Sequence, residues 1–308
     1  MAHYGFSHLD SINASIRMLY RKLGNSRIMS FNRDLNNPAF QISSSQNQSN
    51  QVESFARAIA EHYRMSIGRV VASFKDIPNK AAHVDLSASS DFVVEVNTQA
   101  VQHSDDLLAV LAHEVTHTYL HRTGLHFSET MENEILTDTA ATYLGLGNLI
   151  LNAYCEQKKR IDRNTTEFGT KWFGYLTPVE FGYILAKRAK KFNCNPVPHL
   201  KRDASYAFYA GLAVLQTEYR FPPFNGATRP ARLRYLWNRR RAGNKSIADR
   251  PSDPLLSYYD QGYAFEMHDQ LSVIFKCPSC SQRLRIPAFR RLISVRCPKC
   301  ECTYECAT

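Results

Sequence analysis

Two short segments constrain this chain more than any other part of it: HEVTH at residues 113–117 and NEILTD at residues 133–138. On a helix, residues four positions apart share one face and lie about 6 Å from each other, so His113 and His117 can hold one small cation between them. Glu114 directly follows the first histidine, where its carboxylate can reach a water on the metal without binding the metal itself. The first segment therefore predicts two metal ligands and a catalytic carboxylate on one helix.

A third protein ligand has to come from outside the first segment, and the fourth position is then left for water. Glu134 is the candidate ligand. Asp138, one turn later, is placed to accept a hydrogen bond from a ligating histidine and so fix its tautomer. His121 and His126 are alternative ligands. His121 lies about 12 Å along a straight helix from His113, too far for two metal–nitrogen bonds of about 2.0–2.1 Å to reach the same ion.

The residues around both segments are typical of packed helices. Ser104-Asp105-Asp106 predicts a helix start with acidic residues at the positive end of the helix dipole. Apolar residues then follow in both helices: Leu107, Leu108, Val110, Leu111, Val115 and Leu120 in the first, and Ile135, Ala140, Ala141, Leu144 and Leu146 in the second. An alternative interpretation is two amphipathic helices with satisfied histidines and surface acids, which leaves the spacing of Glu134 and Asp138 unexplained.

The two segments resemble the zinc-binding helices of the gluzincin metallopeptidases, and their sequences are close to those of thermolysin-like enzymes. The resemblance covers only about residues 104–147, the gap between the helices is shorter than in thermolysin, and no thermolysin-like C-terminal domain follows. The compact arrangement, with its LAHEVTHTYLH run, is more similar to the small intracellular gluzincins of the ImmA/IrrE type. The resemblance implies that His113, His117 and Glu134 bind zinc. It also implies that Glu114 is the catalytic carboxylate and that Asp138 orients a ligand. No motif in the sequence matches the family's transition-state-stabilising His, Tyr or Arg.

Four cysteines near the C-terminus form the second strong signal. CPSC at residues 277–280 and CPKC at residues 297–300 are separated by sixteen residues, the pattern of a zinc ribbon whose four thiolates close a tetrahedral structural site. The four predicted ligands are Cys277, Cys280, Cys297 and Cys300. Residues 283–286 and 292–295 supply short alternating strands. Two disulfides are the alternative. Four cysteines remain: Cys302 and Cys306, each of which could replace a ligand, and Cys155 and Cys194, which we expect to be buried thiols.

Charge is distributed unevenly along the 308 residues, whose formal net charge is +10. The net charge is −4 over residues 1–155, +13 over 156–245, −4 over 246–271 and +5 over 272–308. The basic segments could attract nucleic acid or an acidic protein, or could simply be solvated helix faces. The longest apolar run, at residues 107–112, is too short to cross a bilayer, and the N-terminus has no signal-like segment. We therefore expect a cytoplasmic protein with reduced cysteines and no membrane partner.

The order of patterns along the chain predicts an α+β fold. Helical spacing runs from Leu9 to Leu23 and stops at Gly24, a polar linker follows at residues 42–51, and a second helix is marked by Val52, Phe55, Ile59 and Tyr63. Three short strands are expected at residues 69–74, 83–86 and 92–96. The resemblance to zincins implies a small mixed sheet packed on the two metal helices, with the strand at residues 92–97 as the edge along which a peptide substrate pairs.

The part of the chain after the two predicted metal-binding helices is predicted to be mainly helical. Thr177-Pro178-Val179-Glu180 is a capping box that opens a helix ending near Phe192, with Lys187, Arg188, Lys190 and Lys191 covering one end. An apolar helix follows at residues 203–219. Residues 232–241 interleave arginines with Leu and aromatic side chains, which could stack on bases and pair with phosphates or could be a surface helix with snorkelling arginines. The expected layout is an N-terminal helix and linker (1–50), a zincin core (51–155), a basic helical region packed on it (156–271) and a zinc ribbon (272–308).

Three functions are compatible with these patterns. The first is a zinc-dependent endopeptidase that acts on an intracellular protein target recruited by the ribbon, with one catalytic and one structural zinc ion. The second is a nucleic-acid-binding regulator that uses the basic helices and the ribbon, with the zincin core as a sensor or conditional protease. The third is a zinc amidase that acts on a non-peptide amide, because the metal chemistry would be the same.

Overall fold

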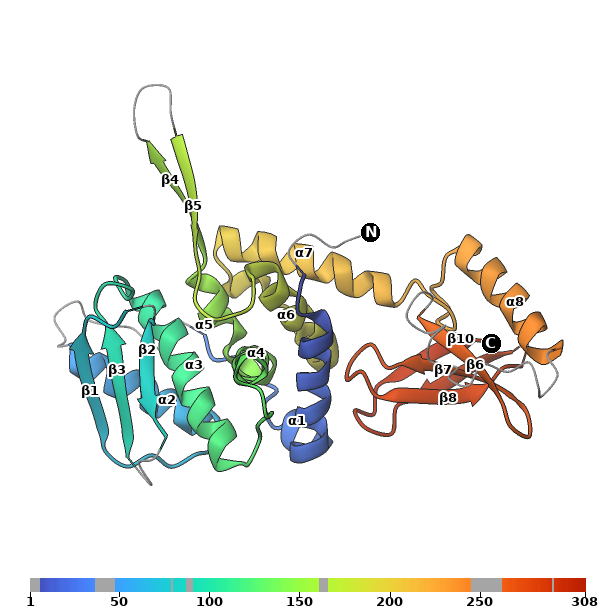
Figure 1. Cartoon of the computed structure of the whole chain (residues 1–308), viewed down its shortest axis with the longest axis horizontal. Helices are drawn as coiled ribbons and strands as arrows, with labels where there is room; N and C mark the ends of the chain where they lie inside the picture. Colours follow the sequence, from blue (N-terminus) through green and yellow to red (C-terminus); the bar gives the residue numbers. More distant parts are fainter. Residues whose placement is uncertain are drawn as a thin grey trace. The chain divides into compact units, whose positions relative to one another are not determined.

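The computed structural model describes residues 6–36, 48–78, 80–86, 91–160, 166–244, 262–289 and 291–308. The chain divides into two compact units, Met1–Gly211 and Leu212–Thr308, and each combines helices with small sheets (Figure 1). The predicted α+β class is confirmed. The boundary between the units falls inside the region 156–271 that the sequence patterns group together. The N-terminal helix belongs to the same unit as the two metal helices.

Unit 1 contains a three-stranded mixed sheet. Its strands are β1 (Val70–Lys75), β2 (Ala82–Asp85) and β3 (Phe92–Asn97). The order is β1-β3-β2, with β1 parallel and β2 antiparallel to β3, so Val94 pairs with Ala72 on one side and Val84 on the other. The three strands match the predicted ones to within about two residues at each end.

The prediction that residues 92–97 form the sheet edge is wrong, because β3 is the central strand and β2 is the edge. The burial pattern gives the physical reason. All six residues of β3 are buried or half-buried, whereas β2 alternates buried Ala82 and Val84 with exposed His83 and Asp85. A strand with one polar, exposed row suits a position with one open side.

Helix α2 (Gln48–His62) directly precedes this sheet in the chain, and the next four helical segments after the sheet are α3 (Ser104–Arg122), α4 (Thr130–Ala141), the π-helical segment η2 (Thr142–Leu146) and α5 (Gly147–Asn152). Helix α3 begins at the predicted Ser104, where Asp106 accepts hydrogen bonds from the N–H groups of Gln102 (3.0 Å) and His103 (2.9 Å). Most residues of α3 from Asp106 to Leu120 are buried, so α3 is the central helix of unit 1.

Helix α1 (Leu9–Met29) packs against α4 and α6 (Pro178–Phe192). In Figure 1 helix α4 is seen nearly end-on between α3 and α1. The predicted end of the first helix at Gly24 corresponds to a break in its helical geometry. Gly24 takes φ 76° and ψ 164°, which kinks the helix, and helical structure then resumes as far as Met29.

Helix α6 begins at the predicted capping box. Thr177 Oγ1 accepts a hydrogen bond from the N–H of Glu180, and Glu180 Oε2 accepts one from the N–H of Thr177 (2.9 Å). Glu180 is fully buried, and its Oε1 also accepts a hydrogen bond from the N–H of His8 (2.7 Å). The same carboxylate therefore caps α6 and holds the residue before α1.

The prediction that Lys187 and Arg188 cover a helix end is wrong, because both are buried. Arg188 donates to Asp34 Oδ1 (2.5 Å) and to the carbonyl oxygens of Phe31 (2.7 Å) and Tyr143 (2.8 Å). A buried guanidinium needs an anion and several acceptors to offset its desolvation. Asp34 provides the anion from 154 residues away in the chain.

The region after α5 is not purely helical. A hairpin of β4 (Cys155–Arg160) and β5 (Thr166–Lys171) precedes α6 and extends away from the body of unit 1 (Figure 1). Helix α7 (Arg202–Glu218) crosses α6 with the two backbones in contact: a Cβ on Gly182 would overlap Ala207, and a Cβ on Gly211 would overlap Tyr183. Glycine is required at both positions by this close approach.

Unit 2 contains helix α8 and two antiparallel sheets. Its elements are α8 (Arg229–Asn244), β6 (Tyr263–Met267), β7 (Leu271–Lys276), β8 (Arg283–Pro287), β9 (Leu292–Arg296) and β10 (Thr303–Ala307). The sheets are β6-β7-β8 and β9-β10. The two predicted ribbon strands correspond to β8 and β9. The sheet whose strand β7 leads into Cys277 begins with β6, before residue 272, because β6 pairs with β7.

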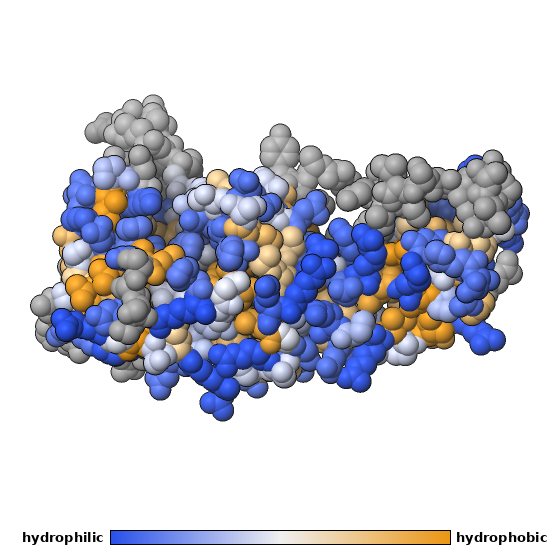
Figure 2. All heavy atoms as spheres, turned by 60° about the horizontal axis from the view of Figure 1, so that its bottom comes forward, coloured by the Kyte–Doolittle hydropathy of each residue, from blue (hydrophilic) through white to orange (hydrophobic). Residues whose placement is uncertain are grey.

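The side of α8 that carries Tyr235 faces the sheet. The Tyr235 ring lies 5.0 Å from that of Tyr263 and 5.1 Å from that of Phe265. The face shown in Figure 2 is mostly hydrophilic, with hydrophobic side chains in separate patches. No helix among the described residues is both long enough and apolar enough to cross a membrane.

Candidate metal centres

Helices α3 and α4 bring together the three predicted ligands of the first site. Glu134 Oε2 lies 3.2 Å from His113 Nε2 and 2.9 Å from His117 Nε2. All three ligand atoms lie within 4.8 Å of one another. Two donors bound tetrahedrally at about 2.0–2.1 Å from one ion are about 3.3 Å apart. The three side chains therefore have the chemistry and the separations that a small metal ion requires.

Asp138 orients the first of these histidines. Its Oδ1 is 2.8 Å from His113 Nδ1, which leaves Nε2 to face Glu134. Its Oδ2 accepts hydrogen bonds from the N–H groups of Tyr175 (2.6 Å) and Leu176 (3.1 Å). This buried carboxylate therefore links the imidazole of a candidate ligand to the backbone that leads into α6.

His117 has a matching partner that the sequence patterns did not identify. Thr137 Oγ1 is 3.2 Å from His117 Nδ1 and donates to the carbonyl oxygen of Asn133 (2.9 Å). Because the Thr137 hydroxyl donates its proton to the carbonyl of Asn133, its oxygen can accept a hydrogen bond from Nδ1–H of His117. Nε2 of His117 is then free of a proton and can bind a metal. Both histidines thus present the same ring nitrogen to Glu134.

Glu134 and His113 have pKa values shifted in opposite directions by their neighbours. Burial alone would raise the pKa of Glu134, but hydrogen bonds from His113 and His117 outweigh it and lower the pKa to about 2. Burial alone would lower the pKa of His113, but the charge of Asp138 and hydrogen bonds to Asp138 and Glu134 raise it well above its usual value. A metal ion would take the place of the proton on Nε2.

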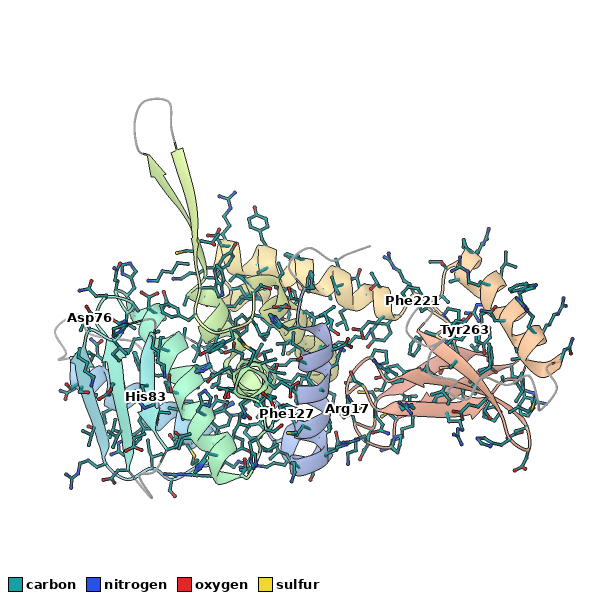
Figure 3. All side chains as sticks on the ribbon, in the orientation of Figure 1. Arg17, Asp76, His83, Phe127, Phe221 and Tyr263 are labelled. Atoms are coloured by element: carbon teal, nitrogen blue, oxygen red, sulfur yellow. The ribbon has the colours of Figure 1, made fainter. Side chains whose placement is uncertain are left out.

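The site opens into a cleft of about 930 Å³. Glu114, buried on α3, lines it beside both histidines and Glu134. One side of the cleft is formed by residues 80–84 with the edge strand β2, on which His83 lies (Figure 3), and another by residues 171–175. The arrangement places a carboxylate, a candidate metal position and an open strand edge in one cleft.

Tyr175 is the functional candidate that the sequence patterns missed. Its ring stacks on that of His113, with centroids 6.3 Å apart and planes at 27°, and its side chain is 46% exposed to the cleft. Burial and the nearby charges of Glu134, Asp138 and Glu114 raise the pKa of Tyr175, so its hydroxyl keeps its proton at neutral pH. It can therefore donate a hydrogen bond into the cleft.

The position of Tyr175 depends on the residue before it. Gly174 takes φ +98°, and a Cβ there would lie 2.7 and 2.8 Å from the two oxygens of Asp138. Only glycine fits this conformation and this distance. The two alternative ligands, His121 and His126, are both exposed and lie outside the cluster of ligand atoms.

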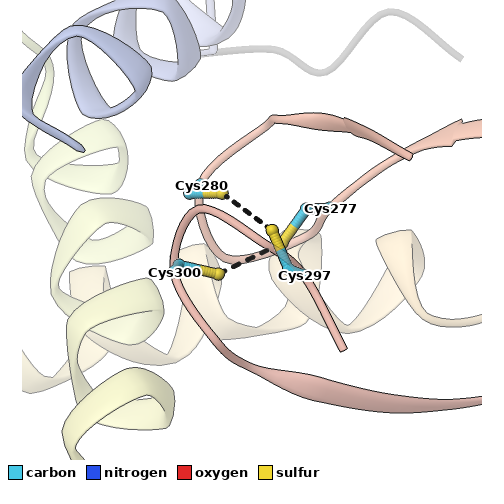
Figure 4. Close-up of side chains that lie close together, drawn as sticks. All are labelled: Cys277, Cys280, Cys297 and Cys300. Atoms are coloured by element: carbon cyan, nitrogen blue, oxygen red, sulfur yellow. Dashed lines mark hydrogen bonds between the residues drawn. The ribbon is translucent and has the colours of Figure 1, made fainter. Parts of the chain in front are cut away.

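The four predicted cysteines converge in unit 2 (Figure 4). Cys277 and Cys300 have their sulfurs 3.5 Å apart, and those of Cys280 and Cys297 are 3.6 Å apart. Thiolates bound tetrahedrally at about 2.3 Å lie about 3.8 Å apart. All four are buried and none forms a disulfide, so this second cluster can hold a metal ion with no open position.

The two knuckles that present these cysteines have the same backbone. The N–H of Ser281 donates to the carbonyl of Cys277 (2.8 Å), and the N–H of Glu301 donates to that of Cys297 (2.9 Å). Ser281 and Glu301 both have positive φ, 56° and 60°. Each CPxC segment is therefore closed by the same tight turn.

The other four cysteines lie outside the cluster of ligand atoms. Cys302 is half-buried with its sulfur 3.5 Å from Ser279 Oγ, and Cys306 is buried. The expectation that Cys155 and Cys194 are buried is wrong, because both are partly exposed. Burial and the charge of Asp34 raise the pKa of Cys194, so this thiol stays protonated at neutral pH.

Comparisons of this chain with protein-family models, with curated proteins and with solved structures find no match.

Proposed function

We propose that this protein is a zinc-dependent endopeptidase of the gluzincin type. The observation that carries the proposal is the convergence of His113, His117 and Glu134 at a cleft that Glu114 also lines. Three protein ligands with an open side are typical of catalytic zinc sites, whereas a buried set of four cysteines is typical of structural ones. The HEVTH and NEILTD segments support the same family by resemblance.

The donor atoms of both clusters favour zinc over magnesium and calcium. Imidazole with carboxylate, and four thiolates, are donor sets of zinc proteins, and magnesium and calcium prefer oxygen donors alone. The separations of 2.9–3.6 Å between paired donors fit tetrahedral coordination. We therefore assign one catalytic and one structural zinc ion to each chain.

Two residues of the cleft, Glu114 and Tyr175, have roles in the proposed reaction. Zinc, when bound, polarises the carbonyl of the scissile bond and lowers the pKa of a water molecule. Glu114 accepts the proton of the attacking water and passes it to the leaving amine. Tyr175 donates a hydrogen bond to the oxygen of the carbonyl as negative charge builds up there.

The edge strand β2 supports a peptide as the substrate. Its outer side has no partner strand in the described sheet, and residues 80–84 line the cleft next to the candidate zinc position. An extended peptide can add to such an edge through main-chain hydrogen bonds, which do not depend on its sequence. We therefore propose β2, and not β3, as the strand along which a peptide substrate pairs.

The test is cleavage of unfolded proteins by the full-length chain, with new peptide termini detected by mass spectrometry. We expect cleavage with zinc, loss of cleavage with a chelator and recovery when zinc is returned. Glu114→Gln should keep both metals and lose about 10²- to 10⁴-fold in rate, because the general base is removed. Glu132→Gln, an exposed carboxylate on α4, is the control and should cleave normally. Undiminished cleavage by Glu114→Gln, or by the metal-free protein, would refute the mechanism.

A further inference from the structure

Helix α8 has an exposed surface that the proposed function leaves unexplained. The helix contains six arginines and no acidic residue. Residues 212–308 contain 16 Lys and Arg against 8 Asp and Glu, so unit 2 accounts for +8 of the net charge of +10. We define the arginine face as the exposed residues Arg229, Leu233, Arg234, Trp237, Arg240 and Arg241.

Two of the six arginines have structural roles and lie off this face. Arg232 donates to the carbonyl oxygens of Ala307 (2.9 Å) and Phe224 (3.0 Å), and Arg239 is buried. The other four are exposed. If α8 were an ordinary surface helix with snorkelling arginines, its apolar residues would face the sheet.

The largest apolar residues of α8 are instead on the outside. Trp237 is 57% exposed and Leu233 is 69% exposed, while the side packed on the sheet uses Tyr235. The guanidinium of Arg241 lies 4.4 Å from the centre of the Trp237 ring, which covers one side of the indole. An exposed indole flanked by arginines suits the stacking of a base together with contacts to phosphates.

The arginine face borders a hollow within the same unit. This hollow, of about 440 Å³, is lined by Arg240 from α8, Arg291 just before β9, and the leucines Leu236 and Leu292. Leu292 is 60% exposed. Positive charge and apolar surface are therefore combined a second time beside Arg240, as they would be for a second nucleotide.

We propose that the arginine face and this hollow bind single-stranded nucleic acid, with a base stacked on Trp237 and phosphates held by Arg240, Arg241 and Arg291. Residues 229–241 span about 18 Å along the helix, enough for a short site of on the order of four nucleotides. An acidic protein would match the charge but gives no reason for the exposed indole. The proposal is independent of the peptidase chemistry, because all of its residues are in unit 2.

The test uses the full chain and a fluorescent twelve-nucleotide oligothymidylate, with affinity measured by anisotropy at several salt concentrations. Trp237→Ala should weaken binding about 5- to 150-fold, since base stacking on an aromatic side chain contributes on that scale. Arg240→Gln with Arg241→Gln should reduce the slope of log K against log salt by about 1.4, at about 0.7 per phosphate on a single strand. Trp237 is exposed, so its removal should leave the melting temperature unchanged.

Matched controls separate a specific face from general attraction to a basic protein. Arg21→Gln with Lys22→Gln removes the same charge from exposed positions of α1, and Tyr206→Ala removes an exposed aromatic ring from α7. Both should bind the oligonucleotide as the wild type does. The proposal would be overturned if Trp237→Ala bound the oligonucleotide as the wild type does, or if the protein bound a duplex of mixed sequence with equal affinity. Displacement of the oligonucleotide by polyglutamate at matched charge would also overturn it, in favour of an acidic protein partner.

Discussion

Replacing Asp138 by asparagine should separate the two tasks of one carboxylate. In the structure Oδ1 accepts from His113 and Oδ2 accepts from the N–H groups of Tyr175 and Leu176. Asparagine has one acceptor oxygen and an NH₂ group. If the oxygen faces the backbone, the NH₂ group faces His113 Nδ1 and favours the tautomer with its proton on Nε2, which cannot bind a metal. If the oxygen faces His113, the two backbone N–H groups lose their acceptor.

The expected magnitudes follow from these contacts. Loss of a partner that orients a metal ligand typically weakens metal affinity about 10- to 100-fold. Loss of a buried hydrogen bond to a charged group costs about 1.5–3 kcal/mol. Unit 1 has 211 residues, and for a unit of that size each 1 kcal/mol shifts the melting temperature by about 2–4 °C. Asp138→Asn should therefore lower the melting temperature of the metal-free protein by about 3–12 °C.

Cobalt(II) titration of the full-length protein measures both affinities, because the thiolate cluster gives strong near-ultraviolet charge-transfer bands, whereas the His/Glu site contributes weaker d–d bands in the visible range. The cysteine cluster thus serves as an internal standard in the same sample. Glu132→Gln, an exposed carboxylate on the same helix, is the matched control and should change neither quantity. A cobalt affinity of the cleft within about twofold of the wild type, together with an unchanged melting temperature, would refute the double role of Asp138.

Three further predictions concern the two metal centres. Tyr175→Phe should lower kcat for peptide cleavage by about 10²- to 10³-fold with little change in KM, as expected for loss of one donor to a developing oxyanion; a kcat close to the wild-type value in steady-state kinetics would exclude this role. His117→Ala should leave one zinc ion per chain in place of two, and elemental analysis that still finds two would contradict the ligand assignment. Cys280→Ser with Cys297→Ser should release the other ion and destabilise unit 2 while the cobalt bands of the cleft persist, and loss of both ions together would show that the sites are not independent.

The histidine pair and each CPxC knuckle, which are parts of the candidate metal sites, could be predicted from the sequence because their information is local. His113 and His117 are one helical turn apart, and the CPxC knuckles each close their own turn. The start of α6 was equally predictable, because the Thr177–Glu180 capping box is complete within four residues. In each of these cases the residues that make the feature are close together in the chain.

The features that the sequence did not reveal depend on contacts between distant residues. The burial of Arg188 requires Asp34, 154 residues away, and nothing in the spacing of charges indicates that pair. The central place of β3 depends on the pairing of three strands, which the apolar pattern of each strand alone does not determine. Tyr175 lies in an irregular segment without periodicity. The positions of Gly174 and Tyr175 are explained only by their contacts with Asp138, which is distant in the sequence.

The crossing of α6 and α7 has a consequence for recognising divergent relatives of this chain. Gly182 and Gly211, 29 positions apart, admit no side chain because each faces the backbone of the opposite helix. The requirement is steric, so it does not depend on whether a metal is bound at either candidate site. A sequence that had lost its histidines and glutamates would still need both glycines to keep the two helices in register. We therefore expect this glycine spacing to be kept in a relative that lacks the candidate metal ligands.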